Sequence, residues 1–146
     1  MATCLGDAMF PEAPRATGRL LRRLGVEVEV PEAQTCCGQP RVNTGYLDEA
    51  VPLVRRTVEA FEGFDAVVVP SGSCAGSVRR QHRLVAERAG APAVADGVAR
   101  LVPRAHELSE LLVDVLGVTD VAASFPHRVT YHPTCHSLRM LRVGDR

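Results

Sequence analysis

The stretch QTCCGQP, from Gln34 to Pro40, places two cysteines side by side, followed by a glycine and, two residues later, a proline. The side chains of adjacent residues diverge, so Cys36 and Cys37 would form only a strained disulfide with each other. We therefore expect the two thiols to reach towards a third group that lies between or beside them. Gly38 lets the backbone approach that group closely, and Pro40 stiffens the turn.

Outward from this turn, the spacing of apolar residues predicts strands and helices in alternation. We expect strands at residues 26–30, 65–70 and 128–133, where apolar residues alternate with polar ones or form a continuous run. Helices are expected around residues 20–24, 47–61 and 104–117, and from residues 74 and 134 onwards, while residues 90–102 follow no clear pattern. The sequence therefore predicts an α/β fold: a layered, Rossmann-like domain with a mostly parallel sheet and helices on its faces.

The five cysteines fall at one kind of position, the turn between a predicted strand and a predicted helix. Cys36 and Cys37 follow the first predicted strand, Cys74 follows the second, and Cys135 follows the third. Cys4 precedes the first predicted helix. Because ligands of parallel sheets bind where strands end and helices begin, we expect the cysteines to gather at one edge of the sheet.

Thiolates at such an edge are strong ligands for zinc and for iron–sulfur clusters. A structural zinc site usually contains a Cys-x-x-Cys motif, and here Ser71 takes the first position of the closest match, which ends at Cys74. Cysteines that are spread over three separate turns favour a cluster over a single ion. The competing interpretation is that the cysteines are buried apolar side chains, which explains single cysteines better than a doublet in a loop.

Composition narrows the classes of function. The 146 residues suffice for one domain with a core, and the formal net charge of zero gives no attraction to nucleic acid or to anionic membranes. No segment is apolar over a length that spans a bilayer, and the first residues lack the pattern of a signal peptide. We therefore expect a cytoplasmic, reducing location, where five cysteines indicate metal or redox chemistry.

Two segments of the chain resemble each other. In VTYHPTCHSL (residues 129–138) and in MATCLGDAM (residues 1–9), a threonine precedes a cysteine and a helix is predicted to follow. Such self-similarity indicates a repeat. We expect residues 1–126 to form a first cysteine-rich domain that lacks its first strand, and residues 127–146 to begin a second, truncated repeat.

Five stretches carry a resemblance to a known family: ATCLGDAMFPEA, PEAQTCCGQPRVNTGY, VVVPSGSCAGSVR, ELSELLVDVLGVTDV and RVTYHPTCH. The sequence resembles the first half of the cysteine-rich CCG-domain proteins, above all the lactate-utilisation protein A group, also described as an iron–sulfur subunit of glycolate oxidase. It is more distantly similar to the CCG-containing component of heterodisulfide reductase. The likeness covers nearly the whole chain, with 31 residues between Cys4 and Cys36 and 33 between Cys37 and Ser71.

The resemblance implies a cofactor, a ligand set and a role. It implies an iron–sulfur cluster of the 4Fe-4S type, a first ligand of the second repeat at Cys135, loops shaped by Gly38, Ser71 and Gly72, and cluster ligands at Cys4, Cys36, Cys37 and Cys74. Ser71 departs from the family motif, which has the first cysteine of a Cys-x-x-Cys pair there. The implied role is electron transfer in a system that oxidises L-lactate to pyruvate, with lactate-utilisation proteins B and C as partners. No residue of the chain is assigned a catalytic role.

Two other functions fit parts of the sequence. CAGSVRR has the Cys-x5-Arg spacing, from Cys74 to Arg80, of cysteine-dependent phosphatases and arsenate reductases, in which loop amides and the arginine hold an oxyanion. This interpretation leaves the doublet unexplained. A thiol–disulfide relay would instead pair Cys36 or Cys37 with Cys74 or Cys4.

The histidines are expected to have structural roles. His132 and His136 flank Cys135 and carry nitrogen atoms that bind metals, but a position at a strand end or in solvent is more common for such residues. His82, His106 and His127 are expected on the surface.

Overall fold

A short parallel sheet lies at the centre of the computed structural model, which describes residues 1–143. Strand β1 (Val67–Val69) pairs with β2 (Ala105–Glu107), so that Val67 lies opposite Ala105 and Val69 opposite Glu107. Both outer valines of β1 are buried, as a continuous apolar run predicts. The α/β class and the parallel pairing are therefore confirmed. The described residues form two strands only, so the larger Rossmann-like sheet stays a prediction.

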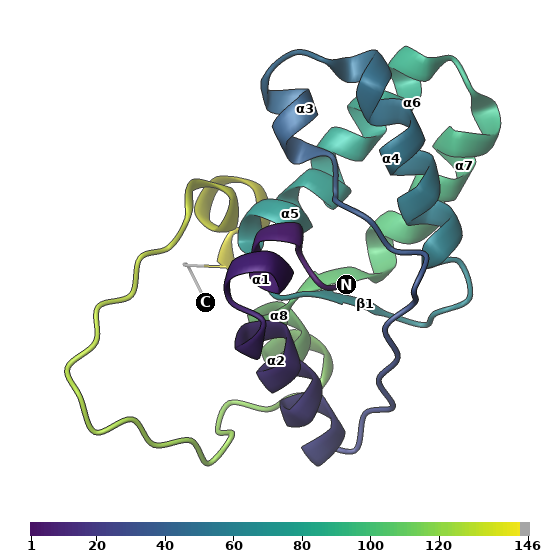
Figure 1. Ribbon diagram of the computed structural model, residues 1–146. Coiled ribbons are helices and arrows are strands. Elements are labelled where there is room, and N and C mark those ends of the chain that lie inside the picture. The colour runs from purple at the N-terminus through teal and green to yellow at the C-terminus, as the bar shows by residue number, and fades with distance from the viewer. Residues whose placement is uncertain (144–146) are drawn as a thin grey trace.

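Helices make up most of the remaining ordered elements (Figure 1). Their bounds are α1 (Cys4–Met9), α2 (Glu12–Arg23), α3 (Gln39–Asn43), α4 (Leu47–Ala60), α5 (Gly72–Gly76), η1 (Ser77–Gln81), α6 (His82–Ala89), α7 (Pro92–Leu101), η2 (Val102–Arg104), α8 (Leu108–Glu110), η3 (Leu111–Val115) and η4 (Ser137–Leu141). The helices α5, η1 and α6 follow one another without a break and form one long helix after β1. The predicted helices at 20–24, 47–61, 74 and 134 are present, and the unpatterned segment 90–102 contains α7.

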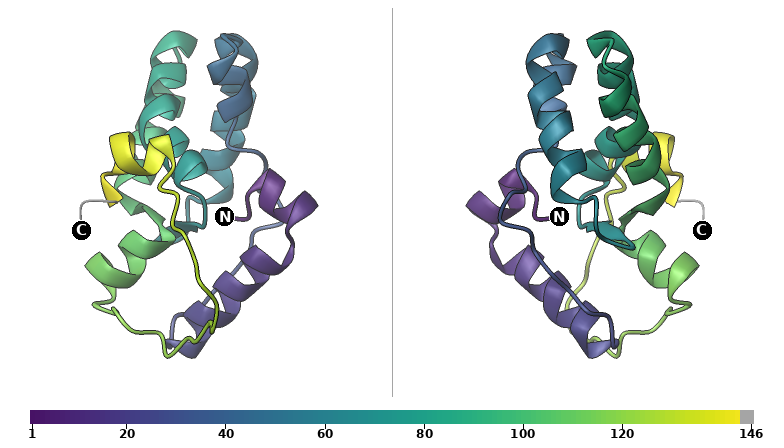
Figure 2. Two further views of the ribbon diagram at one scale, coloured as in Figure 1. Left: turned by 90° about the vertical axis from the view of Figure 1, so that its left-hand side faces the viewer. Right: turned by 90° about the vertical axis from the view of Figure 1, so that its right-hand side faces the viewer.

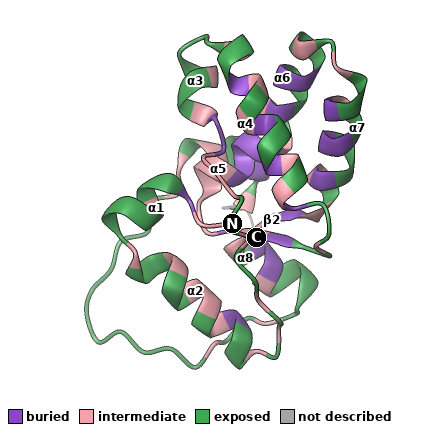
Figure 3. Ribbon diagram, turned by 45° about the vertical axis from the view of Figure 1, so that its right-hand side comes forward, coloured by how far each residue is buried: buried purple, intermediate pink, exposed green. Residues whose placement is uncertain are grey.

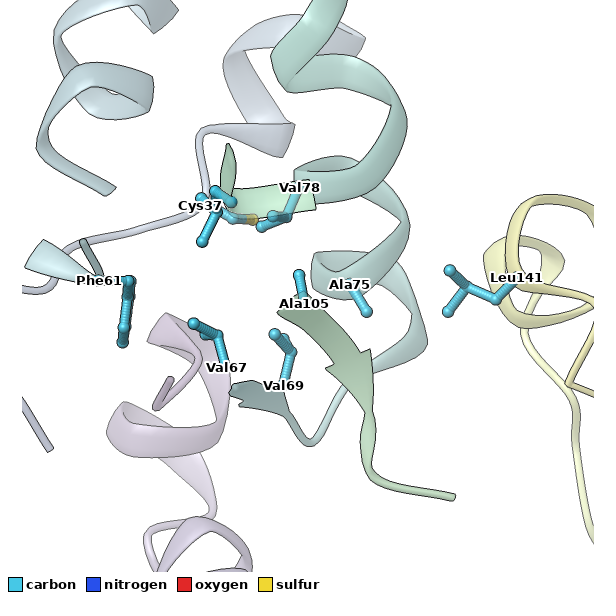
Figure 4. Close-up of a cluster of buried hydrophobic side chains, with 9 residues drawn as sticks. Cys37, Phe61, Val67, Val69, Ala75, Val78, Ala105 and Leu141 are labelled. Carbon is cyan, nitrogen blue, oxygen red and sulfur yellow. The ribbon is translucent and has the colours of Figure 1, made fainter. Parts of the chain in front are cut away.

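Two groups of buried side chains hold the elements together. In the first group α4, α6 and α7 lie side by side (Figures 1 and 2) and bury Ala50, Val54, Val85, Ala86, Val94 and Val98. The second group surrounds the sheet and includes Val67, Val69, Ala75, Val78 and Cys37 (Figure 4). Figure 3 shows that burial is concentrated in these two regions, whereas α1 and most of the long segment that leads to the C-terminal helix are exposed. A cysteine of the doublet is thus part of the core.

The C-terminal helix lies against α5. A side chain added at Gly72 would meet the Ser137 side chain, and one added at Gly76 would meet His136 and Met140. Leu141 is buried in the core cluster around the sheet (Figure 4). The chain therefore returns to the first helix after the sheet. The division into residues 1–126 and 127–146 stays a prediction, and residues 144–146 lie outside the described residues.

Residues 26–30 form no strand, contrary to the prediction. Their burial does alternate, with Val26 and Val28 half-buried and Glu27 and Glu29 exposed. A strand also needs a neighbour that pairs with its backbone, and within residues 1–143 this segment has none. Residues 128–133 form no strand either, for the same reason, and are largely exposed.

The predicted helix over residues 104–117 begins later, at Leu108. A capping box fixes this start: the Glu107 carboxylate accepts a hydrogen bond from the Ser109 N–H at 2.7 Å, and the Glu110 carboxylate accepts one from the Glu107 N–H at 3.1 Å. The three residues before the helix are thereby free to pair with β1 as β2. No helix within the described ranges is long and apolar enough to cross a membrane.

Candidate metal centre

Each cysteine of the predicted site lies at the beginning of a helix, as expected. Cys4 is the first residue of α1, and the preceding Thr3 caps that helix by accepting a hydrogen bond from the Gly6 N–H at 3.2 Å. Cys36 and Cys37 end the loop that precedes α3. Cys74 lies in α5, just after the turn that follows β1. Three separate segments therefore deliver the four thiols.

The doublet contacts two different partners. The sulfur of Cys36 lies 3.5 Å from the sulfur of Cys4, on the exposed side of the site. The Cys37 thiol points into the protein, beside Val78 (Figure 4), and forms a hydrogen bond with Cys74. The expectation that the two adjacent thiols diverge is therefore confirmed, and each of them meets a cysteine from another segment.

Electrostatics links the two pairs. The hydrogen bond from Cys37 lowers the pKa of Cys74, against the effect of burial. The same hydrogen bond, followed by burial, raises the pKa of Cys37 above its usual range, so Cys74 loses its proton first. The negative charges of Cys4 and Cys36 act on Cys74 and raise its pKa, which places all four sulfurs in one electrostatic neighbourhood. Partial desolvation, and then the hydrogen bond with Cys36, raise the pKa of Cys4.

The arrangement fits a group that is larger than one metal ion. Among residues 1–143, no three His, Cys, Asp or Glu side chains are placed to hold a single ion. Two thiol pairs that share one neighbourhood instead offer four soft donors on two sides of a common position, and this is the donor chemistry of iron–sulfur clusters. The thiol of Cys135 is exposed on the C-terminal segment and takes no part in the described interactions of the other four.

The residues that were predicted to shape the loops do so in different ways. Gly38 has φ +82°, a left-handed conformation that favours glycine, at the N-terminal end of α3. Ser71 caps α5 by accepting a hydrogen bond from the Cys74 N–H at 3.4 Å. Gly72 lets the C-terminal helix approach, because an added Cβ would lie 1.8 Å from the Ser137 hydroxyl oxygen. Ser71 is thus a helix cap in this structure.

Two residues that the sequence analysis did not assign also hold the site. His82 was predicted on the surface, and this is wrong: it is 0% exposed, and its Nε2 lies 2.8 Å from the carbonyl oxygen of Cys37. Gln39 donates its side-chain N–H to the Ser73 carbonyl at 3.1 Å and lies 3.1 Å from His136 Nε2. Neither has a sequence signal beyond its place beside the doublet or one helix away.

The geometry around Cys74 does not form an oxyanion cradle. A phosphatase loop would leave the amides after the cysteine free, but the Ala75 N–H donates to the Ser71 carbonyl and the Ser77 N–H donates within α5. Arg80 is exposed on the continuing helix. A surface hollow of about 410 Å³ beside α4 contains none of the cysteines; it is lined by Ala33, Pro52, Arg55, Arg56, Glu59 and Ala60.

Comparison with known proteins identifies the family. The model of the cysteine-rich domain family CCG matches residues 1–79, which include all four gathered cysteines. The chain belongs to the CCG cysteine-rich domain family. The CCG domain thus accounts for the doublet, for the cysteine of α1 and for that of α5.

Relatives of this CCG domain share one name. The chain is 43% identical over 143 residues to lactate utilization protein A of Oceanobacillus iheyensis, covering 98% of the chain and 57% of that protein. It is 46% identical to the protein of that name from Geobacillus kaustophilus (98% and 59% covered) and 41% identical to that from Bacillus subtilis (97% and 58%). The chain therefore spans less than two thirds of the length of these relatives. No solved structure matches it significantly.

Proposed function

We propose that Cys4, Cys36, Cys37 and Cys74 hold an iron–sulfur cluster, and that the chain transfers electrons in a lactate utilisation system. The observation that carries this proposal is the convergence of the four thiols from three segments as two facing pairs. The membership of the CCG family supports it, because the matched residues contain all four. When bound, such a cluster supplies one-electron transfer at a potential that its surroundings set.

The chain's own residues prepare the site for this role. Cys37 is 3% exposed and packs in the core, so this side of the site is shielded from water. Cys4 is exposed, so the opposite side is open to a partner. The exposed apolar side chains Leu5, Met9 and Phe10 lie on α1 or directly after it, beside Cys4. We propose that electrons enter or leave on this open side.

The relatives' name supports the choice of system. We propose that the electrons come from the oxidation of L-lactate to pyruvate, carried out in the cytoplasm with lactate-utilisation proteins B and C. The chemistry on lactate is then placed outside this chain, whose gathered residues are thiols without a general base among them. The chain is a subunit of an oxidoreductase in this proposal.

Anaerobic metal analysis tests the cluster. The chain is purified and reconstituted with ferrous iron and sulfide under anaerobic conditions, and its iron, acid-labile sulfide and electron paramagnetic resonance spectrum are measured. We expect a brown protein whose iron and sulfide fall sharply in each of Cys4→Ser, Cys36→Ser, Cys37→Ser and Cys74→Ser. Cys135→Ser is the matched control and should retain both. Equal iron in all five variants, or none in the parent, would contradict the proposal.

A second measurement tests the system. The loaded chain is mixed with proteins B and C and L-lactate, and reduction of the cluster is followed by its spectrum. We expect reduction that requires L-lactate and both proteins. A cluster that stays oxidised while pyruvate accumulates would place the chain outside the electron path.

The distance between Cys4 and Cys36 also supports one alternative, a thiol–disulfide relay, since 3.5 Å is close to bonding contact for two sulfurs. A relay predicts a colourless protein that cycles between two thiols and one disulfide with a defined dithiol partner. The iron and sulfide analysis therefore separates the two functions.

A further inference from the structure

A π-helical turn interrupts the long helix that follows the site. Residues 77–81 form η1, and at its end the His82 N–H donates a hydrogen bond to the carbonyl of Ser77, five residues back. In a regular α-helix, residues five apart point about 140° away from each other. The wider turn brings Ser77 and His82 towards one face, and both are 0% exposed. Such turns are frequent at functional sites.

His82 contacts the doublet through one defined atom. Its Nε2 lies 2.8 Å from the Cys37 carbonyl oxygen, and a carbonyl only accepts hydrogen bonds, so Nε2 carries the proton. Burial lowers the pKa of His82 to about 4, and the ring is therefore neutral. Nδ1 is buried and has no hydrogen-bond partner within residues 1–143. The imidazole thus makes one hydrogen bond, and it makes it to the peptide that follows Cys37.

Ser77 contacts the other end of the same residue. Its hydroxyl interacts with the Cys37 sulfur and lowers the pKa of that thiol. The alignment falls short of a full hydrogen bond, and the buried hydroxyl has no other partner in the described part of the chain. A thiolate at Cys37 would accept this hydroxyl proton as a hydrogen bond. One helical turn therefore holds both the backbone and the sulfur of Cys37.

The doublet needs such an anchor. Cys36 and Cys37 end a loop without regular secondary structure, and Gly38 then takes its left-handed conformation. Because the Cys37 carbonyl is held on α6, the Cys37 side chain is directed towards Cys74, and the preceding Cys36 is directed away, towards Cys4. Without the anchor, the loop could rotate and lose one of the two pairs.

We propose that His82 is a positioning residue for the doublet, whose Nε2–H holds the Cys37 carbonyl so that the two adjacent thiols face different partners. Ser77 is the second anchor, and its hydroxyl donates to the Cys37 thiolate. The proposal rests on the proposed function, because the thiols that are positioned are the proposed cluster ligands. Hydrogen bonds to ligand sulfurs raise the reduction potential of iron–sulfur clusters, since they stabilise the more negative, reduced state.

Matched substitutions separate positioning from simple packing. In His82→Gln the amide nitrogen falls near the place of Nε2 and can still donate, whereas in His82→Asn the same group is too short to reach. His106→Gln is the control for the loss of a partly buried histidine away from the site. All variants are made in the full chain, and urea unfolding of each metal-free protein identifies any that fails to fold.

The first readout needs no metal. Alkylation of Cys37 by iodoacetamide in the metal-free chain is followed residue by residue by mass spectrometry. We expect the rate in His82→Asn to rise on the order of tenfold, because the carbonyl loses its partner and the loop opens more often. Rates in His82→Gln and in the His106→Gln control should match the parent. Equal rates in His82→Asn and the parent would overturn the proposal.

The second readout uses the reconstituted protein. We expect His82→Asn to lose most of its iron and to change its electron paramagnetic resonance spectrum, with both rescued in His82→Gln. Ser77→Ala should keep its iron but have a more negative midpoint potential. An unchanged potential in Ser77→Ala would overturn the role of Ser77. If the parent binds no iron, the proposed function fails, and the alkylation rates still decide the role of His82.

Discussion

The sulfur atoms of Cys4 and Cys36 lie 3.5 Å apart, although the two residues are 32 positions apart in the sequence. The next residue, Cys37, turns the other way and bonds to Cys74 in the protein interior. The doublet therefore joins an exposed thiol pair to a buried one. This relationship has consequences that can be measured with and without a metal.

Mild oxidation of the metal-free chain should link Cys4 to Cys36. These two thiols are close and accessible, whereas Cys37 is buried and its raised pKa keeps it protonated and unreactive. Two thiols lose two protons and two electrons to an added oxidant such as diamide, and one disulfide forms. Peptide mapping without reduction should find the 4–36 link first. A dominant link that involves Cys135 would contradict the described arrangement.

Substitution of Gly72 by alanine should displace the C-terminal helix. The new Cβ would lie 1.8 Å from Ser137 Oγ and 3.2 Å from Thr134 Oγ1. We expect a loss of about 1–3 kcal/mol in the free energy of unfolding, as is usual for overpacking. Hydrogen exchange should become faster in residues 135–141. Gly63→Ala is the control, since no atom lies within 4 Å of its added Cβ, and similar exchange in both variants would show that the helix does not dock on α5.

Helix α7 should depend on Gly97 in the same way. A Cβ at this position would lie 2.3 Å from Cγ1 of Val58 on α4. We expect Gly97→Ala to lower the free energy of unfolding by about 1–3 kcal/mol. Adding Val58→Ala should remove the clash, so that the double variant loses less than the sum of the two single changes. Urea denaturation of all four proteins gives the coupling energy, and strictly additive losses would contradict this contact.

The ion pair between Arg79 and Glu110 should stabilise the fold far more than the ion pairs on the surface. Arg79 Nη1 lies 2.9 Å and 2.8 Å from the two carboxylate oxygens of Glu110, whose side chain is 5% exposed. We expect Glu110→Gln to lower the free energy of unfolding by about 1–3 kcal/mol, since it weakens the pair and the capping box together. Glu62→Gln breaks the exposed pair with Arg100 and should change it by less than about 1 kcal/mol. Equal losses in the two variants would count against this assignment.

The sequence was informative where local chemistry decides the structure. The apolar run 67–69 formed a buried strand, the divergence of Cys36 and Cys37 followed from their adjacency, and Gly38 took a left-handed conformation. The sequence was misleading where structure depends on a distant partner. Val26 and Val28 alternate like a strand but have no neighbouring strand within residues 1–143 with which to pair.

His82 shows a second limit. A histidine between polar neighbours on a helix reads as a surface residue, because the π turn that rotates it inward leaves no mark in the pattern of apolar residues. Its partner is a backbone carbonyl, which every residue has. Contacts of a side chain with a distant backbone group therefore escape any prediction that counts side chains alone.

The most direct test of the common thiol site is a map of thiol protection in the anaerobically loaded chain. Native mass spectrometry measures the bound iron and sulfide, and alkylation under the same conditions reports which cysteines stay free. We predict that Cys4, Cys36, Cys37 and Cys74 are protected together while Cys135 is labelled. A loaded protein in which any of these four is labelled as fast as Cys135 would contradict a single centre held by all four.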